Sequence, residues 1–408
     1  MIFGTTPAGP APGAILSCDV VVVGRGANGC AAALGLAQAG LRTVLVGPNP
    51  VVETDAWDPR VYALSPASRA LLERLRVWPA MDAERIQAIE AMRVFPDARP
   101  DAPELHFAAD EAGAPALAWM LEARNLGQAL ERALGFSPVR VHAAQVTEAS
   151  SLPDRIELGF DDGVRLRARL LVAADGAGSP LRSLLGIPVL ERVYPQHAVV
   201  GNFACSVAHE GCAWQWFGEH GVLALLPLPG QRCSIVWSAP PALADALMAL
   251  PPDEFARQVA ATAGGALGAL APLGPARCFP LRMVRAESLI APRAVLLGDA
   301  AHAMHPLAGQ GLNVGFGDVA ELLAVVAGRE PFRDLGDRLL LRRYERARRE
   351  PVLAMTFATD ALQRLFDPEP QAALPAALRP LRALRETGWR MVAGTPWLRR
   401  RFVRHAVS

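Results

Sequence analysis

The chain contains no lysine, and all 41 of its basic residues are arginine. This absence excludes several classes of enzyme. A nucleoside triphosphatase with a Walker phosphate loop needs the lysine of that loop. Enzymes that use pyridoxal phosphate or form a Schiff base need an amine nucleophile. We therefore expect neither kind of chemistry from this protein.

The six cysteines form no recognisable metal or redox motif. None of them has the paired Cys-x-x-Cys spacing of zinc ribbons and dithiol centres. Cys18 and Cys30 lie in apolar segments that are typical of a protein core. We expect reduced, buried thiols and no metal site.

Long apolar runs and targeting signals are also missing. No apolar stretch reaches the roughly 18 residues of a spanning helix, so the sequence predicts none. The first apolar run is a predicted strand at 18–23, and no secretory signal precedes it. We expect a cytoplasmic protein.

With 408 residues, 51% of them hydrophobic, the chain can bury a large core and form two or three structural units. Its net charge of +1 does not indicate nucleic-acid binding. The charge is uneven, because residues 331–408 hold 16 arginines against 8 acidic residues. This basic end, with its arginine-rich stretch at 397–404, is either a solvated helical face or a surface attracted to an anionic membrane.

A first glycine signature follows the strand at 18–23. Gly24, Gly26 and Gly29 have the Gly-x-Gly-x-x-Gly spacing of dinucleotide-binding units, and a helix at 31–39 and a strand at 42–46 follow. In such units the first glycine allows a tight turn, the second lets the backbone approach a pyrophosphate, and the third lets helix and strand pack closely. We expect these three glycines to bind the pyrophosphate of a dinucleotide.

One part of this fingerprint is missing. The acidic residue that usually ends the second strand, and accepts hydrogen bonds from the ribose hydroxyls, is replaced by Gly47. Glu53 or Asp55 could reach back from the following loop. The contact to the ribose is therefore open at this stage.

Two further signatures end strand-like runs. Segments 156–160 and 164–171 flank Asp161, Asp162 and Gly163, a hairpin signal, and the second run leads to Asp175 and Gly176. A short apolar run at 295–297 leads to Gly298 and Asp299, where an open α/β sheet binds its ligand. We expect Asp299 to accept from a ribityl hydroxyl, so the three signatures together predict FAD.

The third signature continues into a glycine-rich segment that opens an apolar helix. We expect its backbone N–H groups to face the flavin, because a helix N-terminus favours the negative charge of the reduced ring. The contributing residues are Pro306, Gly309, Gln310, Gly311, Leu312 and Asn313. His302 and His305 are expected to shape this loop through hydrogen bonds, since no third metal ligand follows at useful spacing.

The fold class that these patterns predict is α/β (α+β). An FAD-binding Rossmann-like domain at 1–185 and 281–330 carries an inserted, mainly antiparallel sheet at 186–280, and helices follow at 331–408. Four strand-like runs form that sheet, and helices from residue 339 onward are expected to bend or break at Pro351, Pro375 and Pro380. Its aromatic and apolar residues are either ordinary core or a substrate wall: Trp214, Trp216, Leu223, Leu225, Pro227 and Trp237.

The chain resembles class A flavoprotein monooxygenases of the ubiquinone-biosynthesis hydroxylase family, from Asp19 to about Phe402. The stretches that carry the resemblance are Gly24 to Gly29, Asp58 to Leu64, Glu122 to Gln128, Ala173 to Gly176, Ala208 to Gly211, Leu223 to Pro227 and Gly298 to Asn313. The resemblance implies a fold like that of para-hydroxybenzoate hydroxylase. It also implies FAD as cofactor, with Arg60 along it and Gln128 or Arg124 near its pyrophosphate or ribityl.

The same resemblance implies that NAD(P)H reduces the flavin, that O2 forms a C4a-hydroperoxide, and that this hydroxylates a polyprenylated phenol precursor of ubiquinone. Such a substrate suits an apolar sheet and a protein peripheral to the inner membrane, in contact with other ubiquinone-biosynthesis proteins. Two alternatives stay open, a hydroxylase of a small soluble phenol and a non-catalytic FAD-binding subunit. No residue stands out as a phenol-activating base, and His209 and His220 are the candidates.

Overall fold

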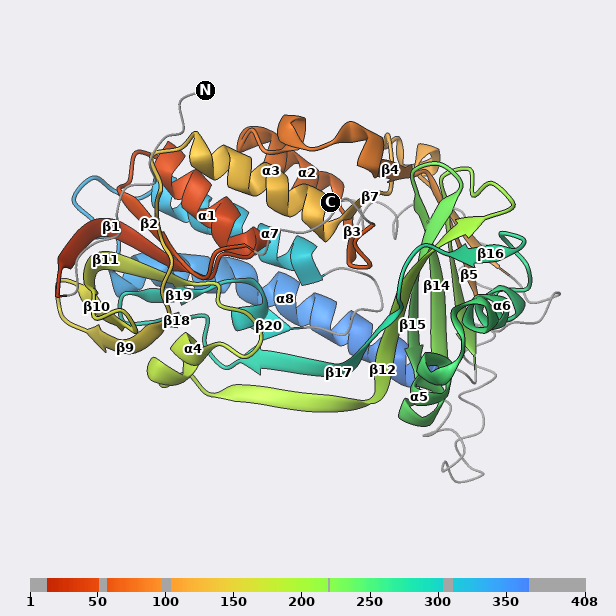
Figure 1. Ribbon diagram of the computed structural model, residues 1–408. Helices are drawn as coiled ribbons and strands as arrows, with labels where there is room; N and C mark the ends of the chain where they lie inside the picture. The colour runs from red at the N-terminus through yellow and green to blue at the C-terminus, as the bar shows by residue number, and fades with distance from the viewer. Residues whose placement is uncertain (1–12, 51–56, 97–103, 219–220, 304–310, 367–408) are drawn as a thin grey trace.

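The computed structural model describes residues 13–50, 57–96, 104–218, 221–303 and 311–366. Two large sheets lie at opposite ends of the molecule, and the long strands β12 (Val189–Cys205) and β17 (Arg277–Ala286) join them (Figure 1). The architecture confirms the predicted fold class, an α/β domain that carries a mainly antiparallel sheet.

The first sheet has the strand order β18-β19-β11-β1-β2-β8 in the described residues, and β10 and β9 extend from β11. The strands from β19 to β8 are parallel, whereas β10 and β11 form the predicted hairpin. All of β2 is buried, because both faces of a parallel sheet are covered. The bounds are β1 (Ile15–Val23), β2 (Thr43–Val46), β8 (Arg140–His142), β9 (Val146–Ser151), β10 (Ile156–Phe160), β11 (Arg165–Ala173), β18 (Ile290–Ala291) and β19 (Ala294–Leu296).

The turn from β1 into α1 (Ala27–Gln38) depends on close approach of the backbone. Gly24 has φ +115°, and a Cβ atom there would lie 2.1 Å from the carbonyl oxygen of Ala174. A Cβ atom on Gly29 would lie 1.7 Å from the carbonyl oxygen of Gly24. Strand and helix therefore touch at a point where only glycine fits.

The second sheet has the strand order β20-β17-β12-β15-β14-β13-β5-β6 in the described residues, with β16 beside β12. The four predicted strands are present as β12 to β15 and pair antiparallel. The sheet extends beyond the predicted segment 186–280, because β5 pairs in parallel with β13. The other bounds are β5 (Ala91–Phe95), β6 (Leu105–Ala108), β13 (Cys212–Gly218), β14 (Gly221–Leu228), β15 (Arg232–Ala239), β16 (Leu270–Pro272) and β20 (His302–Ala303).

A small sheet connects the two large ones. It consists of β3 (Val61–Leu64), β7 (Ala118–Glu122) and β4 (Ile86–Ile89) in the order β3-β7-β4. Its buried residues Ile89 and Met120 pack against Ala213 and Leu228 of the second sheet. This apolar contact fixes the second sheet against the rest of the molecule.

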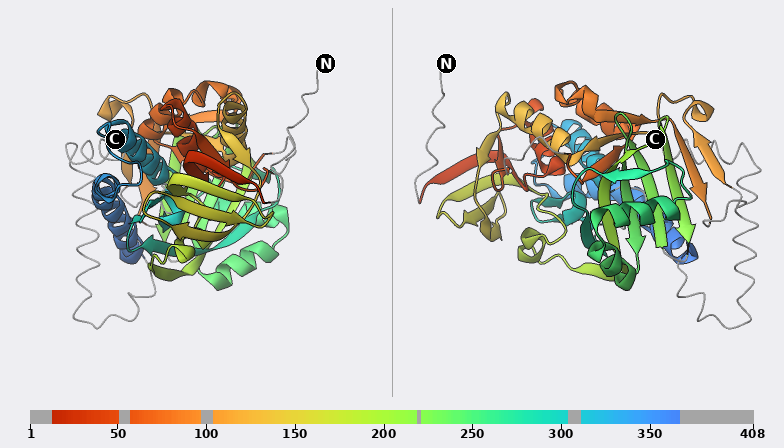
Figure 2. Two further views of the ribbon diagram at one scale, coloured as in Figure 1. Left: turned by 90° about the vertical axis from the view of Figure 1, so that its left-hand side faces the viewer. Right: turned by 45° about the vertical axis from the view of Figure 1, so that its right-hand side comes forward.

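The remaining helices cover the sheets. α2 (Pro66–Arg74) begins after Ser65, whose hydroxyl accepts a hydrogen bond from the N–H of Ser68 as a cap. α3 (Ala123–Gly135) packs on α1, whereas α6 lies across the second sheet (Figure 2, right). The other bounds are α4 (Pro180–Leu184), α5 (Pro241–Ala249), α6 (Pro252–Thr262), α7 (Gly311–Ala327) and α8 (Arg338–Phe366).

α7 and α8 lie side by side along the first sheet (Figure 2, left). The Tyr344 hydroxyl of α8 donates to the carbonyl of Leu296 at 2.8 Å, which fixes the helix to β19. α8 continues through Pro351, so the helix does not break at this one of the three prolines. Pro375 and Pro380 lie outside the described residues. None of the helices in the described part of the chain has both the length and the apolarity that crossing a membrane requires.

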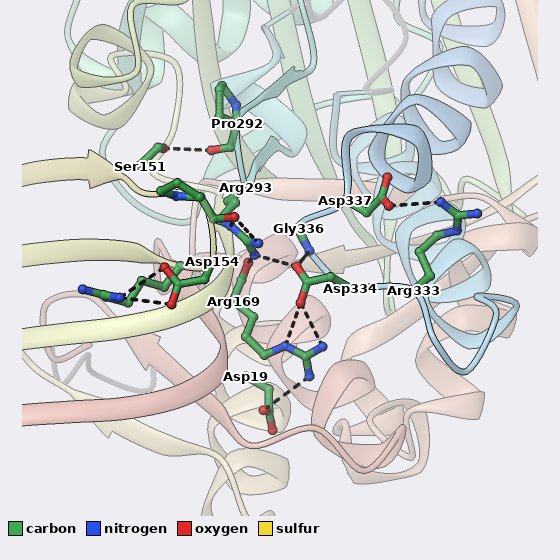
Figure 3. A network of polar contacts seen from close by, with 12 residues as sticks. Asp19, Ser151, Asp154, Arg169, Pro292, Arg293, Arg333, Asp334, Gly336 and Asp337 are labelled. Atoms are coloured by element: carbon green, nitrogen blue, oxygen red, sulfur yellow. Dashed lines mark hydrogen bonds and ion pairs between the residues drawn. The ribbon is translucent and has the colours of Figure 1, made fainter.

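A network of arginines and carboxylates joins the loop before α8 to the first sheet (Figure 3). Asp334 accepts from Arg169 of β11 at 3.0 Å and from Arg293 at 2.6 Å. Burial opposes ionisation of Asp334, but hydrogen bonds from Gly336, Arg293 and Arg169 outweigh it and lower the pKa of its carboxyl. The network places α8 against the sheet edge.

The close contact at Gly29 makes a prediction about stability. Gly29→Ala should lower the free energy of unfolding by about 3 kcal/mol, because the new methyl group must displace backbone. Gly26→Ala is the matched control, since a Cβ atom there would meet nothing within 4 Å. Its cost at this helix cap should not exceed about 1 kcal/mol. Urea unfolding of the two apoproteins measures both values, and equal losses would contradict the packing role of Gly29.

Candidate functional site

A cavity of 1030 Å³ opens at the carboxyl ends of β1, β2 and β11. This is the edge where an open parallel sheet binds its ligand. Seven of the residues that the sequence predicted to bind the cofactor line it: Gly24, Gly26, Arg60, Arg124, Gln128, Asp175 and Gly176. The structure therefore brings together residues from the first and second signatures and from α3.

The N-terminus of α1 faces this cavity. Gly26 is its cap residue, no side chain caps the helix, and no acidic residue lies in the first turn. Because Gly26 has no Cβ atom and the space beside it is open, a ligand can approach the free N–H groups. This geometry suits an anion such as a pyrophosphate.

α3 presents one face to the cavity. Arg124, Gln128 and Glu131 are four and three residues apart, so they lie on the same side of the helix, and all three line the cavity. Arg60 lines the cavity beside the start of α3, since its carbonyl accepts from the N–H of Ala123. Its guanidinium pairs with Asp58 at 3.5 Å, and its side chain stays 59% exposed. The arginines provide charge complementary to a phosphate-containing ligand.

In the second signature, the side chain of Asp175 stabilises the turn that leads from β11 to α4. Its carboxylate accepts from the Ser179 hydroxyl at 2.6 Å and from the N–H of Leu181 at 3.1 Å. Burial raises the pKa of Asp175, and these hydrogen bonds oppose the rise. The carboxylate thus fixes the start of α4, and Gly176 next to it lies on the cavity wall.

The third signature forms a tight turn, η4 (Gly298–Ala300), at the end of β19. A Cβ atom on either Gly298 or Gly315 would lie 2.2 Å from the amide nitrogen of Asn28. Asn28 of α1 therefore lies between this turn and α7, and its amide oxygen is buried without a hydrogen-bond partner in the described structure. Asp299, the next residue after Gly298, is exposed. Desolvation by the surrounding protein raises the pKa of its carboxyl, and the charge of His302 opposes this rise.

A buried group of charges lies directly behind this turn. Asp318 of α7 accepts from the N–H of Gly298 at 2.9 Å, from the Arg348 guanidinium at 2.7 Å, and pairs with His302 at 2.7 Å. Burial opposes ionisation of Asp318, but His302 and Arg348 outweigh it and lower the pKa of its carboxyl. In turn, Asp318 raises the pKa of His302 against the opposing effect of burial.

The predicted residues of the glycine-rich segment have different outcomes. Gly311 and Leu312 begin α7, whereas Pro306, Gly309 and Gln310 lie outside the described residues. Asn313 holds the junction of β3 and α2, because its oxygen accepts from the N–H of Ser65 and its amide donates to the carbonyl of Ala63. These hydrogen bonds fix the start of α7 against the end of β3 and the start of α2.

The predicted substrate wall lies on the helix-covered face of the second sheet. Trp214, Trp216, Leu223, Leu225 and Trp237 belong to one buried cluster with Phe255 and Val259 of α6. Pro227 pairs with Cys233 of the same cluster. The structure thus places these residues in a packed core, which is the alternative that the sequence left open.

The opposite face of the second sheet is turned toward the small sheet and the first sheet. Side chains alternate along a strand, so Gln215, Ala224 and Val236, which are paired in register, share this inward face. Asn202 on the same face donates to the carbonyl of Asp58, next to Arg60 of the cavity wall. Sequence reasoning missed this face because both faces of β14 are apolar.

His209 is fully engaged by backbone. Its Nδ1 accepts from the N–H of Gly211 at 3.1 Å, so its Nε2 carries the proton and donates to the carbonyls of Leu228 and Gly230. The imidazole closes the turns at the ends of β13 and β14. This leaves it no nitrogen for a substrate, and the other candidate base, His220, lies outside the described residues.

The comparisons with known proteins agree with this geometry. A family model described as "FAD binding domain" matches residues 17–359. Ubiquinone hydroxylase UbiL of Rhodospirillum rubrum is 36% identical over 395 residues, which cover 96% of this chain and 89% of that protein. The chain belongs to the ubiquinone-biosynthesis hydroxylase family of FAD-dependent monooxygenases.

Further relatives support this family. The 3-demethoxyubiquinol 3-hydroxylase of Escherichia coli is 32% identical over 402 residues, covering 96% of this chain and 98% of that protein. Two solved structures share the fold at a TM-score of 0.74. They are p-nitrophenol 4-monooxygenase PnpA of Pseudomonas putida, 20% identical with coverage of 96% and 97%, and HpxO of Klebsiella pneumoniae with FAD, 19% identical with coverage of 95% and 97%.

As in the rest of the ubiquinone-biosynthesis hydroxylase family, FAD is the cofactor and NAD(P)H the co-substrate. The residues present fit FAD. The backbone of Gly26 at the start of α1 is open to a pyrophosphate, and Arg124 and Gln128 lie across the same cavity. The reactive oxygen chemistry is supplied by the flavin, whereas the protein binds and orients it.

The buried pair of His302 and Asp318 predicts a pH dependence of stability in this hydroxylase. Because the pKa of His302 is raised above 6.5, the stabilisation from its imidazolium is complete below pH 6.5 and is lost as pH rises through the folded pKa. His302→Gln should therefore flatten the decline of unfolding free energy above pH 6.5. Urea unfolding at increasing pH tests this.

His106→Gln, in the edge strand β6, is the control for loss of one imidazole. If His302→Gln and His106→Gln change the pH profile equally, the buried pair does not cause the decline. An unchanged slope in His302→Gln would lead to the same conclusion.

Proposed function

We propose that this flavoprotein hydroxylates the ring of a polyprenylated phenol precursor of ubiquinone, as a 2-polyprenyl-6-methoxyphenol hydroxylase does. The observation that carries the proposal is the similarity to UbiL and to the 3-demethoxyubiquinol 3-hydroxylase, each over 96% of this chain. Both names describe hydroxylases of the ubiquinone series. The flavin, once reduced by NAD(P)H, would supply the oxygen atom from O2.

The inward face of the second sheet supports an apolar substrate. Arg232 shares this face at its edge, at the start of β15, where its guanidinium lies over the Trp57 ring. The central positions, read by alternation along β12 to β15, carry no charged side chain. They are Ala198, Val200, Asn202, Ala213, Gln215, Phe217, Val222, Ala224, Leu226, Ser234, Val236 and Ser238. A small acidic phenol would call for a cationic group among these central positions, so their uncharged and largely apolar lining favours a prenylated ring.

The role that we propose for the chain's own residues is positioning. The inward face would exclude water from the ring, with Gln215 as a buried polar group able to orient a ring hydroxyl. Asp299 would hold the ribityl chain of FAD, because its carboxylate is exposed at the end of β19. His209 is not retained as a base, since backbone groups occupy both of its nitrogens.

Deletion of the gene for this chain from its source organism should change the quinone pool. We expect a mono-methoxy polyprenylphenol to accumulate, as measured by mass spectrometry of lipid extracts, and restoration of the chain to remove it. The purified holoenzyme should oxidise NAD(P)H faster when that phenol is added and release a hydroxylated product.

An unchanged quinone pool would defeat the proposed substrate. Phenol-stimulated oxidation with a small soluble phenol alone would support the soluble-phenol alternative instead. Restoration of the pool without any hydroxylated product from the purified protein would identify a non-catalytic FAD-binding subunit.

We also propose that the hydroxylase binds peripherally to an anionic membrane surface. The sequence carries an arginine-rich stretch at 397–404. Among the described residues, the start of α8 offers Arg342 and Arg346 beside Leu339, which is 60% exposed. Phe332 nearby is 83% exposed. Arginines flanked by exposed apolar side chains are typical of a membrane-surface contact.

Liposome flotation tests this surface. The protein should float with anionic vesicles and stay behind with neutral ones, because each arginine near the surface contributes about 1 kcal/mol. Removal of residues 391–408, or the double change Arg342→Gln with Arg346→Gln, should each lower the bound fraction severalfold. Equal binding to neutral vesicles, or no effect of either change, would refute the proposal.

A further inference from the structure

There is no room for a side chain at Gly47, the residue that follows β2. An ideal Cβ atom on Gly47 would lie 2.9 Å from the backbone nitrogen and 2.9 Å from the Cβ atom of Arg25. In other dinucleotide-binding units this strand end carries the acidic residue that binds the adenosine ribose. Here no carboxylate at position 47 can fit without displacing the first glycine turn.

Arg25 occupies the space beside this strand end, and its guanidinium is fixed. It donates from Nε to one oxygen of Glu131 at 2.9 Å and from Nη2 to the other at 2.6 Å. A third hydrogen bond runs from Nη1 to the side-chain oxygen of Asn49 at 2.9 Å. Such a two-pronged contact holds a carboxylate in one orientation.

The pair brings a carboxylate from another element to the place where β2 lacks one. Glu131 belongs to α3, 106 residues along the chain, yet it and Asn49 both line the cavity. Its side chain is 26% exposed, whereas that of Arg25 is 12% exposed. The carboxylate is therefore the more accessible partner. Each of its oxygens accepts one hydrogen bond from Arg25 and keeps a second acceptor position.

We propose that Glu131 accepts the hydrogen bonds from the adenosine ribose hydroxyls of FAD, and that Arg25 is the positioning residue for it. The acid that binds the ribose has moved from the end of β2 to α3. The ribose contact is preserved because Arg25, which packs against Gly47, holds the Glu131 carboxylate in place. The proposal requires FAD as cofactor and does not depend on the identity of the phenol.

Flavin binding to the apoprotein tests the assignment, because FAD contains the adenosine and FMN lacks it. Glu131→Gln keeps the size of the side chain but removes its charge. It should weaken FAD binding about tenfold and leave FMN binding unchanged, since a hydrogen bond to a charged group is lost only with FAD. Quenching of flavin fluorescence gives both dissociation constants. Unchanged FMN binding also shows that the variant is folded.

Asp299→Ala is the matched contrast, because the ribityl chain is common to both flavins. It should weaken FAD and FMN alike and yield colourless protein. Arg25→Met should reproduce the loss specific to FAD, and the double variant with Glu131→Gln should lose no more than the worse single change.

Three results would overturn the proposal. One is equal weakening of FMN and FAD by Glu131→Gln, and another is no weakening of either. The third is a loss specific to FAD in Arg25→Met but not in Glu131→Gln, which would make Arg25 itself the contact to the ribose. Loss of hydroxylation with normal binding of both flavins bears only on the proposed substrate.

Discussion

The buried carboxylate of Asp318 is the contact on which the arrangement of the flavin site depends. Its two oxygens accept from the backbone of Gly298, from His302 and from Arg348. These donors come from the turn after β19, from β20 and from α8. A charge completely removed from water is tolerated only when it is paired and hydrogen-bonded in this way. One side chain of α7 thus fixes the Gly298–Asp299 turn, and with it the start of the helix that the sequence associates with the flavin.

The glycine turns were predictable because their requirement is local. At Gly24 and Gly29 the backbone lies so close to other backbone that a Cβ atom does not fit. Only glycine lacks a Cβ atom, so a glycine in the sequence already indicates such a close contact. The strands β12 to β15 were predictable for a similar reason, since apolar runs between glycine and proline turns mark them. The fold could be inferred from such signals together with the family resemblance.

Other features depend on partners far along the chain. The sequence shows that β14 is apolar on both faces, but only packing against α6 shows which face is core. Trp214 and Trp237 lie on that core face, so they are not part of the substrate wall that we propose. β5 joins the second sheet from more than a hundred residues upstream of β13. The pairing of Arg25 with Glu131 could not be read from either residue alone. The absence of an acid at Gly47, beside an arginine within the glycine motif, was the signal that pointed to it.

The long strand β12 determines how the second sheet is connected to the dinucleotide-binding domain. It runs for 17 residues within the second sheet, and it pairs with β17 over Val189–Val193 and again over His197–Val200. The register changes between Val193 and His197, around Pro195, which has no N–H to donate to a ladder. The ladder between β12 and β17 is therefore interrupted at this bulge. Beyond the bulge the two strands form a paired arm whose end, at Val189 and Ala286, connects to α4 and β18 of the dinucleotide-binding domain.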